Sequence, residues 1–254
     1  MRVVDRRRQI VDLIGSAGRV QAQDLATRFE VNAETIRRDL SSLEESGQLQ
    51  RIYGGAISKS RLIVEGSVAT RSTELREIKD KIAAEAAREI PAFGAIFIEA
   101  GSTTARLVGA LPLRGDLLVV TNALQTALAL SDLGALSVMT IGGRIRQRSY
   151  AEVDSWALER LASLRFDVAF VGTNAIDCDW GLSTPDPAEA AVKRAIISSA
   201  RRTVLMVDHT KFGRSAACRY GALEDVDLVV TDIGTDESYL EEIRALGLDV
   251  RVTN

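Results

Sequence analysis

The chain has 254 residues and a formal net charge of −3, and 46% of its residues are hydrophobic. This length suits a small module joined to one larger domain, and the apolar content can fill a sizeable core. Two cysteines exclude a disulfide framework, and with one histidine they exclude a typical structural zinc site. No apolar run has the length of a membrane span and no secretory segment is evident, so we expect a cytoplasmic protein without a metal or cofactor.

Arginine is concentrated at the start of the chain. Residues 1–57 carry nine arginines and no lysine, although the chain as a whole is slightly acidic. A cationic segment inside an acidic chain is typical of a module that binds nucleic acid.

The spacing of apolar residues predicts three short helices in this segment. Ile10, Leu13 and Ile14 mark the first helix, residues 24–29 mark the second, and Asn32 begins the third. Three short helices with a tight turn before the last are typical of a helix-turn-helix. The β-prone stretch L-Q-R-I-Y-G-G-A-I comes next. Its glycine pair predicts a hairpin, the wing of a winged helix-turn-helix.

The third helix, which begins N-A-E-T-I-R-R-D-L, has the features of a helix that reads DNA. Asn is a good N-cap, and the apolar residues recur at the spacing of one buried stripe. The polar surface is left with a threonine and two arginines, whose guanidinium groups suit phosphates or guanine edges in the major groove. Which arginine reads a base stays open. We predict DNA contacts from this helix and the wing at Asn32, Thr35, Arg37, Arg38, Arg51 and Tyr53. Arg6–Arg8 fits a solvated helix face and phosphate contacts equally well.

Residues 58–76 are polar without a sustained period and are expected to form a linker. From Lys79 onward, short apolar runs alternate with helical stretches, which predicts a parallel sheet covered on both faces. We therefore predict an α/β chain with a winged helix-turn-helix over residues 1–57 and a larger parallel-sheet domain over residues 77–254. The expected strands are 96–98, 117–120, 138–141, 168–171, 204–207 and 228–230.

Polar residues follow several of these strands, and ligands of open parallel sheets bind beyond the carboxyl ends of the strands. The sharpest element is Gly101–Thr104, G-S-T-T, which lies where a strand is expected to turn into a helix. Its free N–H groups and hydroxyls suit a phosphate, although ordinary helix capping explains them as well. Lys193, Lys211 or Arg144 are candidates for the countercharge. No Walker-type G-K-[ST] sequence is present, so nucleotide hydrolysis is not indicated.

Taken together, these motifs resemble the DeoR family of bacterial transcriptional regulators. The N-terminal part of the resemblance is L-A-T-R-F-E-V-N followed by T-I-R-R-D-L and R-I-Y-G-G-A. The C-terminal part is I-E-A-G-S-T-T, V-V-T-N, D-V-A-F-V-G and V-D-H-T-K-F-G. The resemblance implies a sensor domain similar to ribose-5-phosphate isomerase, with a phosphorylated sugar or polyol as effector. It also implies an effector site, to which we assign Lys79, Gly101, Ser102, Thr103, Thr104, Thr121, Asn122, Gly142, Gly143, Arg144, Lys193, Asp208 and Lys211.

Three positions depart from the family pattern. Asn32 stands where the family usually has Ser, Glu99 stands where it usually has Asp, and residues 150–154 replace a segment that more often contains Gly. Both Asn and Ser cap helices, so the first departure leaves the recognition helix intact. The third departure affects one expected wall of the effector site.

We therefore predict a DNA-binding regulator, most simply a repressor of a sugar or polyol operon that works as a dimer or tetramer. The alternative is an enzyme like a sugar-phosphate isomerase with an appended DNA-binding module. It would need a general base, for which Glu189 and Asp208 are candidates, but the segment after the strand at 168–171 is poor in acids. A sugar-phosphate-sensing protein that never touches DNA leaves the N-terminal module unexplained.

Overall fold

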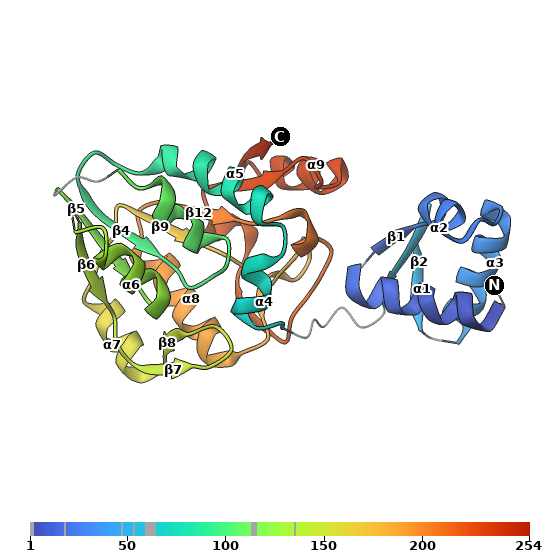
Figure 1. The fold of residues 1–254 in the computed structure, drawn as a ribbon, viewed down its shortest axis with the longest axis horizontal. Coiled ribbons are helices and arrows are strands. Elements are labelled where there is room, and N and C mark those ends of the chain that lie inside the picture. The colour runs from blue at the N-terminus through green and yellow to red at the C-terminus, as the bar shows by residue number, and fades with distance from the viewer. Residues whose placement is uncertain are drawn as a thin grey trace. The chain divides into compact units, whose positions relative to one another are not determined.

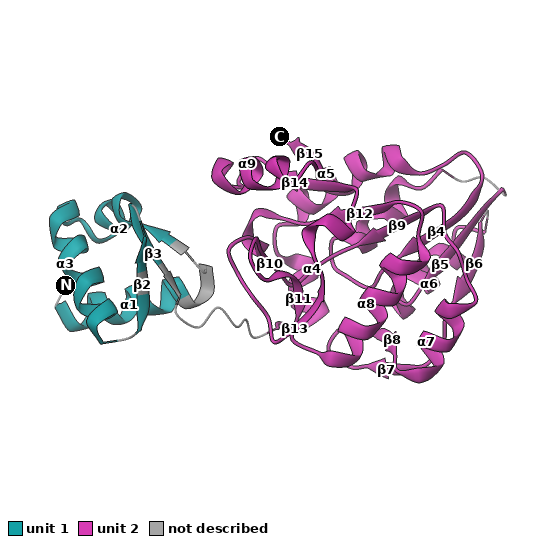
Figure 2. Cartoon of the chain, turned by 180° about the vertical axis from the view of Figure 1, so that it is seen from behind, with its two compact units in different colours: residues 1–63 teal, residues 64–254 magenta. Residues whose placement is uncertain are grey.

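The computed structural model divides the chain into two compact units, unit 1 at residues 1–63 and unit 2 at residues 64–254 (Figures 1 and 2). Each unit has its own hydrophobic core. In the part of the chain that the structure describes, no helix is long and apolar enough to cross a bilayer. The described residues are 3–17, 19–46, 48–52, 54–58, 65–112, 116–134 and 136–254.

Unit 1 is a winged helix-turn-helix, as the sequence predicts. Ile36, Leu40 and Leu43 of the third helix pack against Ile10 and Ile14 of the first, so the predicted apolar stripe is the core. A small antiparallel sheet of order β1-β3-β2 carries the wing. Its elements are α1 (Val3–Ala17), β1 (Arg19–Gln21), α2 (Ala22–Phe29), α3 (Ala33–Glu45), β2 (Leu49–Ile52) and β3 (Gly55–Ser58).

The first strand of this sheet was not expected from the sequence, because three residues are too few to show a period of two. Its presence explains the second glycine of the wing. A Cβ atom on Gly55 would lie 2.0 Å from the carbonyl oxygen of Val20 in β1. Glycine is therefore required where β3 of the wing pairs with β1.

Unit 2 is built on a seven-stranded parallel sheet of order β15-β14-β12-β9-β4-β5-β6. The six predicted strands are all present. The strands are β4 (Gly94–Ile98), β5 (Leu117–Thr121), β6 (Ser137–Thr140), β9 (Val168–Val171), β12 (Thr203–Met206), β14 (Leu228–Asp232) and β15 (Asp249–Thr253).

Helices cover both faces of this sheet (Figure 1). Successive strand residues alternate between the two cores, so Ile96 and Ile98 belong to one and Phe97 to the other. One face carries α5 (Arg76–Ala86), η2 (Thr104–Ala110) and α6 (Leu124–Ser131). The other carries α7 (Ser155–Ala162), α8 (Pro187–Ser199) and α9 (Glu237–Ala245).

The sheet has a switch point between β4 and β9. From β4 the chain moves outward through β5 to the edge strand β6, and it then returns to β9 on the other side of β4. At such a point the loops that follow the two central strands run in opposite directions and leave a crevice at the carboxyl edge. The loops concerned are those after Ile98 and Val171.

The helix predicted after Gly101 is present as the 3-10 helix η2. Two features of unit 2 differ from the sequence prediction. The expected linker at 58–76 is too long at its C-terminal end, because α4 (Val68–Thr73) and the start of α5 lie inside it and belong to unit 2. Small antiparallel pieces were not anticipated either, namely β7 (Arg144–Arg146) with β8 (Ala151–Val153), and β10 (Ala175–Asp177), β11 (Gly181–Thr184) and β13 (Cys218–Gly221).

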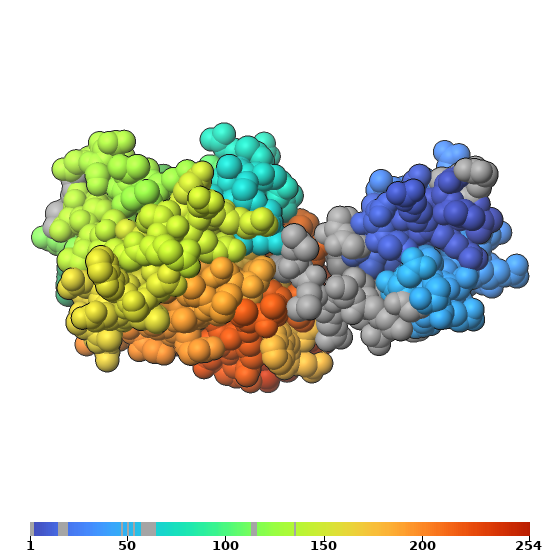
Figure 3. All heavy atoms as spheres, turned by 90° about the horizontal axis from the view of Figure 1, so that it is seen from below, coloured from blue at the N-terminus to red at the C-terminus, as the bar shows by residue number. Residues whose placement is uncertain are grey.

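Helix α4 has only six residues, so its periodicity is invisible in the sequence. Tertiary contacts hold it. The backbone N–H of Val68 donates to the carbonyl oxygen of Arg148 at 2.8 Å, and Arg106 donates to the carbonyl oxygen of Ser72 at 2.6 Å. Figure 3 shows the cyan segment from residue 65 lying against the yellow-green segment around residue 148.

Candidate functional site: a DNA-reading helix and an anion pocket

The recognition helix α3 begins with the predicted cap. The side chain of Asn32 accepts a hydrogen bond of 2.7 Å from the backbone N–H of Thr35 and a second of 2.7 Å from its hydroxyl. The cap satisfies an N–H group that the first turn leaves without a helical partner. Asn32 and Thr35 therefore fix the start of the helix whether or not they also contact DNA.

The two arginines of α3 point into solvent. The side chains of Arg37 and Arg38 are 62% and 80% exposed, and each meets Glu34 only at a long distance, 3.4 Å and 3.7 Å. Surface pairs of this kind contribute little to stability. Both guanidinium groups are therefore free to exchange Glu34 for a DNA phosphate or base.

On the wing, Arg51 lies beside α3. Its guanidinium donates to the hydroxyl of Ser41 at 2.8 Å, and its backbone N–H donates to Glu44 at 2.8 Å. The predicted contact at Tyr53 lies outside the described residues.

Arg6 has a structural role, which decides one of the alternatives left open by the sequence. Its guanidinium is buried and donates to Asp39 at 2.6 Å, and Arg7 donates to the other oxygen of Asp39 at 2.8 Å. Arg7 also bonds the hydroxyl of Ser42. These contacts join α1 to α3, so the Arg6 side chain is not available to contact DNA. Arg8, by contrast, is exposed.

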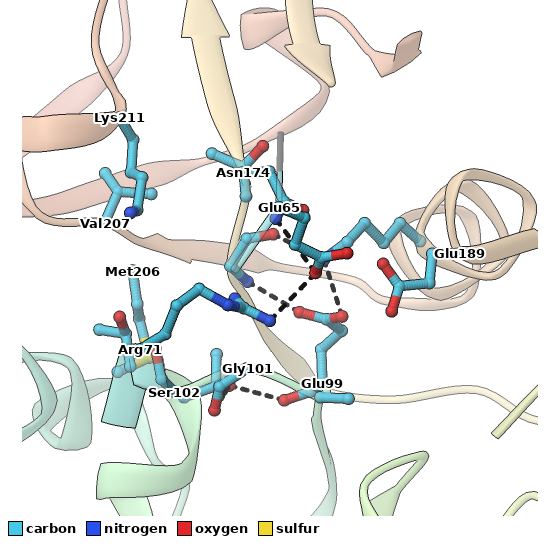
Figure 4. Close-up of a pocket in the computed structure, with 16 residues that line it drawn as sticks. Glu65, Arg71, Glu99, Gly101, Ser102, Asn174, Glu189, Met206, Val207 and Lys211 are labelled. Atoms are coloured by element: carbon cyan, nitrogen blue, oxygen red, sulfur yellow. Dashed lines mark hydrogen bonds and ion pairs between the residues drawn. The ribbon is translucent and has the colours of Figure 1, made fainter. Parts of the chain in front are cut away.

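In unit 2 a pocket opens at the switch point, at the carboxyl ends of β4, β9 and β12 (Figure 4). The volume open to the centre of a water molecule is about 20 Å³, which is room for little more than one water. Six of the predicted effector residues line it, namely Gly101, Ser102, Thr103, Thr104, Lys193 and Lys211. The other lining residues are Glu65, Arg71, Glu99, Ala100, Gly172, Thr173, Asn174, Glu189, Met206 and Val207.

The G-S-T-T loop offers hydrogen-bond donors to this pocket. Among the described residues, none accepts a hydrogen bond from the backbone N–H of Gly101, Ser102 or Thr103. The hydroxyl of Thr104 is not available, because it donates to the carbonyl oxygens of Glu99 and Gly101 at 2.6 and 3.1 Å. The loop therefore presents three N–H groups and the hydroxyls of Ser102 and Thr103, a donor set that suits an oxyanion.

Lys193 forms a buried ion pair at the base of the pocket. Its ammonium group lies 2.7 Å from Glu99, donates to the carbonyl oxygen of Gly172 at 2.9 Å and stands 5.4 Å from the centre of the Tyr220 ring. Burial raises the pKa of Glu99, and Lys193 opposes that shift. The pair ties α8 to the ends of β4 and β9, so Lys193 already has a structural role.

Lys211 and Asp208 come from the loop after β12. The ammonium group of Lys211 lies 3.9 Å from Asp208, too far for a hydrogen bond, and burial lowers the pKa of this lysine. Asp208 itself is outside the pocket lining and caps η3 (His209–Lys211) by accepting from the N–H of Thr210 at 3.1 Å. Lys211 is thus the cation that is least committed to this chain's own carboxylates.

Glu65 and Arg71, from the segment expected to be linker, also line the pocket. Arg71 donates to Glu65 at 3.1 Å, and Glu65 also meets Arg146 at 2.7 Å and Asn174 at 3.4 Å. Figure 4 shows the guanidinium group of Arg71 lying across the pocket between Glu65 and the G-S-T-T loop. No local signal in the sequence identifies these residues, because only the fold brings residue 65 to the end of β4.

Thr121 and Asn122 follow β5, one strand away from the switch point, and do not line the pocket. Thr121 donates to the carbonyl oxygen of Ile98 at 2.6 Å, and Asn122 accepts from the N–H of Ala100 at 2.8 Å. Both are buried. They therefore position the G-S-T-T loop from behind.

Gly142, Gly143 and Arg144 follow the edge strand β6, two strands from the switch point, and do not line this pocket. Arg144 is exposed and pairs with Asp154 at 2.5 Å. A Cβ atom on Gly143 would lie 2.5 Å from the carbonyl oxygen of Val153, so glycine is needed there for close packing. The order of the strands separates these residues from the pocket.

Lys79 does not line the pocket either. Its ammonium group donates to the carbonyl oxygens of Arg71 and Glu74 at 2.5 and 2.8 Å, which holds the end of α4. Burial lowers its pKa. Lys79 thus supports the backbone of Arg71.

An exposed cationic recognition helix and an anion-suited pocket in a separate unit define a ligand-regulated DNA-binding protein. The chain belongs to the DeoR family of transcriptional regulators. The DeoR-like helix-turn-helix domain matches residues 6–61, and the DeoR C terminal sensor domain matches residues 74–233.

Two relatives match almost end to end. The HTH-type transcriptional regulator GlpR of Haloferax volcanii is 33% identical over 246 residues, which cover 97% of this chain and 96% of that protein. The glycerol-3-phosphate regulon repressor of Escherichia coli is 34% identical over 232 residues, 91% of this chain and 92% of that protein. These relatives are regulators rather than enzymes, and this chain is a regulator of the same kind.

Among solved structures, ribose 5-phosphate isomerase A of Neisseria gonorrhoeae is 17% identical, with a TM-score of 0.40 over 55% of each chain. The Plasmodium falciparum ribose 5-phosphate isomerase is also 17% identical, with a TM-score of 0.39 over 54% of this chain and 53% of that one. These likenesses are too distant to place a ligand.

Proposed function

We propose that this protein represses an operon for the uptake or breakdown of a sugar or polyol, and that a phosphorylated form of that compound is its effector. Unit 1 binds operator DNA through α3, with contacts from Thr35, Arg37, Arg38 and the wing. Unit 2 binds the effector at the switch point. The protein acts as a dimer or tetramer in the bacterial cytoplasm, because paired recognition helices read repeated half-sites.

The observation that carries this proposal is the donor set of the pocket. Three backbone N–H groups of the G-S-T-T loop, which have no acceptor among the described residues, belong to the lining of one cavity together with the cations Arg71 and Lys211. Backbone donors and cations around one cavity suit a phosphate group better than an uncharged sugar. The names of relatives, which include glycerol-3-phosphate and aga operon repressors, agree with a phosphorylated effector.

The effector assignment is tested by a thermal-shift screen against phosphorylated sugars and polyols, each beside its unphosphorylated form. We expect stabilisation by a phosphorylated compound alone. Thr103→Val and Lys211→Ala should blunt the shift, and exposed Arg144→Ala should not. Equal shifts with and without the phosphate group would contradict the proposal.

The DNA assignment is tested by gel shifts on duplexes that the wild-type protein selects from a random library. Arg37→Ala and Arg38→Ala should each weaken binding by about tenfold without unfolding unit 1, because both side chains face solvent. Wild-type affinity should fall steeply with salt, because phosphate contacts release counterions. Unchanged affinity in both variants would show that α3 does not read DNA.

A further inference from the structure

Two cations of the pocket, Arg71 and Lys193, pair closely with carboxylates that belong to this chain. Because their charges are already balanced, an anionic ligand must replace a carboxylate or bring unbalanced charge into a buried site. The nitrogen-to-oxygen distances are 3.1 Å for Arg71 and Glu65, 2.7 Å for Lys193 and Glu99, and 3.9 Å for Lys211 and Asp208.

The pocket is also too small for a phosphate group as it stands. Its free volume holds little more than one water molecule, and the Arg71 side chain lies across it (Figure 4). A ligand that reaches the N–H groups of Ser102 and Thr103 therefore has to move Arg71. The side chain of Arg71 is 17% exposed, so it has a path to solvent that the 5% exposed side chain of Lys193 lacks.

Glu65 retains a cationic partner if Arg71 moves, whereas Glu99 loses its own if Lys193 moves. Without Arg71, Glu65 keeps the amide of Asn174 at 3.4 Å and Arg146 at 2.7 Å, a cation that it shares with Asp186 and Glu189. Within the described residues, Glu99 has only Lys193 as a cationic partner and is otherwise bonded to the N–H of Gly172. Loss of Lys193 would leave a buried carboxylate without a countercharge.

We propose that the Glu65 carboxylate is an internal substitute for the anionic group of the effector, and that effector binding transfers Arg71 from Glu65 to the ligand. This inference rests on the proposed function, because it assumes an anionic effector in this pocket. Glu65 thereby sets effector selectivity. A ligand can displace Glu65 from Arg71 only if it binds Arg71 at least as strongly as a carboxylate does.

The same exchange reaches the start of unit 2. Glu65 is the first described residue of unit 2 after β3, and its backbone carbonyl accepts a hydrogen bond from Arg148. Loss of the Arg71 contact therefore loosens residues 65–68 at the N-terminal end of the described part of unit 2.

Binding measurements on the full-length protein test the exchange, with inorganic phosphate and glycerol 3-phosphate as probes in calorimetry. Glu65→Gln removes the competing charge and should bind both probes about five- to tenfold more tightly than wild type. Arg71→Gln should bind them at least about tenfold more weakly. Glu241→Gln, an exposed glutamate of α9, is the matched control and should match wild type. Equal or weaker binding by Glu65→Gln overturns the exchange.

Hydrogen exchange measured by mass spectrometry on the wild-type protein tests the same inference without a variant. With glycerol 3-phosphate bound, peptides from residues 101–107 should exchange more slowly, and peptides from residues 65–72 should exchange faster. An ordinary pocket wall would become protected instead. Slower hydrogen exchange at residues 65–72 would therefore also overturn the proposed transfer of Arg71 from Glu65 to the ligand. If residues 101–107 nevertheless show slower hydrogen exchange, the proposed function still holds. If no phosphorylated compound binds wild type or Glu65→Gln, both the proposed function and the transfer of Arg71 are overturned.

Discussion

Units 1 and 2 place the side chains that we propose as functional in opposite environments. In unit 1, Arg37 and Arg38 are 62% and 80% exposed, and the core is made by other residues. In unit 2, the side chain of Lys193 is 5% exposed and helps to hold the fold through Glu99. In unit 1, the residues proposed for function are therefore not the ones that stabilise the fold. In unit 2, one residue is proposed to do both.

Asp39→Ala should destabilise unit 1 by about 5 kcal/mol, because it leaves the buried Arg6 without a countercharge and also removes the Arg7 contact. Native-state hydrogen exchange of α1 and α3 in the full-length chain measures the change. Glu45→Ala, an exposed position of the same helix, should have almost no effect. A small effect of Asp39→Ala would mean that the two helices do not depend on this pair.

Lys193→Met should destabilise unit 2 by about 3 kcal/mol, because the buried Glu99 loses its cation. The pKa of Glu99 is already raised by burial, so the variant should be least destabilised at low pH, where this carboxyl takes up a proton. Urea unfolding at several pH values measures this. The double variant Glu99→Gln with Lys193→Met should recover part of the lost stability. If it recovers none, Lys193 does not stabilise unit 2 through Glu99.

The single histidine should make the stability of unit 2, and not of unit 1, depend on pH near neutrality. Nδ1 of His209 lies 2.7 Å from Asp232, and this hydrogen bond raises the pKa of His209. A raised pKa stabilises the fold below the ordinary histidine value, and the contribution disappears as pH rises through the folded-state pKa. The stability difference between wild type and His209→Gln should therefore be larger at about pH 6 than at about pH 8.5. A larger stability difference at the higher pH would contradict this prediction.

Arg144→Ala should leave the stability of unit 2 almost unchanged, because its partner Asp154 is also exposed. Calorimetry should also show unchanged affinity for glycerol 3-phosphate. A marked loss of affinity would support the predicted place of Arg144 in the effector site and put part of the ligand two strands from the switch point.

The comparison also shows where sequence reasoning succeeds. The recognition helix was predicted with its cap and buried stripe, because both depend on residues within about one helix of each other. The six strands were predicted because buried parallel strands are continuous apolar runs. Helix α4 and strand β1 were missed because elements this short are stabilised by distant contacts rather than by their own pattern.

For the pocket, local sequence identified which residues follow strands but not which strands are neighbours. The loops after β4, β5 and β6 look alike in the sequence, as strand ends with small and polar residues. The order of the sheet places only the first of them at the switch point, beside the loop after β9. This order separates Gly101–Thr103 from Gly142–Arg144.

Local periodicity and capping in the sequence were enough to predict the recognition helix and the strands of unit 2, and the motifs carried the resemblance that identified the class of protein. The tertiary structure alone decided that Arg6 belongs to a buried pair and that Lys79 supports α4. It also brought Glu65 and Arg71 from an apparent linker to the end of β4. The physical reason is that a buried charge needs a partner, and the fold supplies that partner from residues far away in the chain.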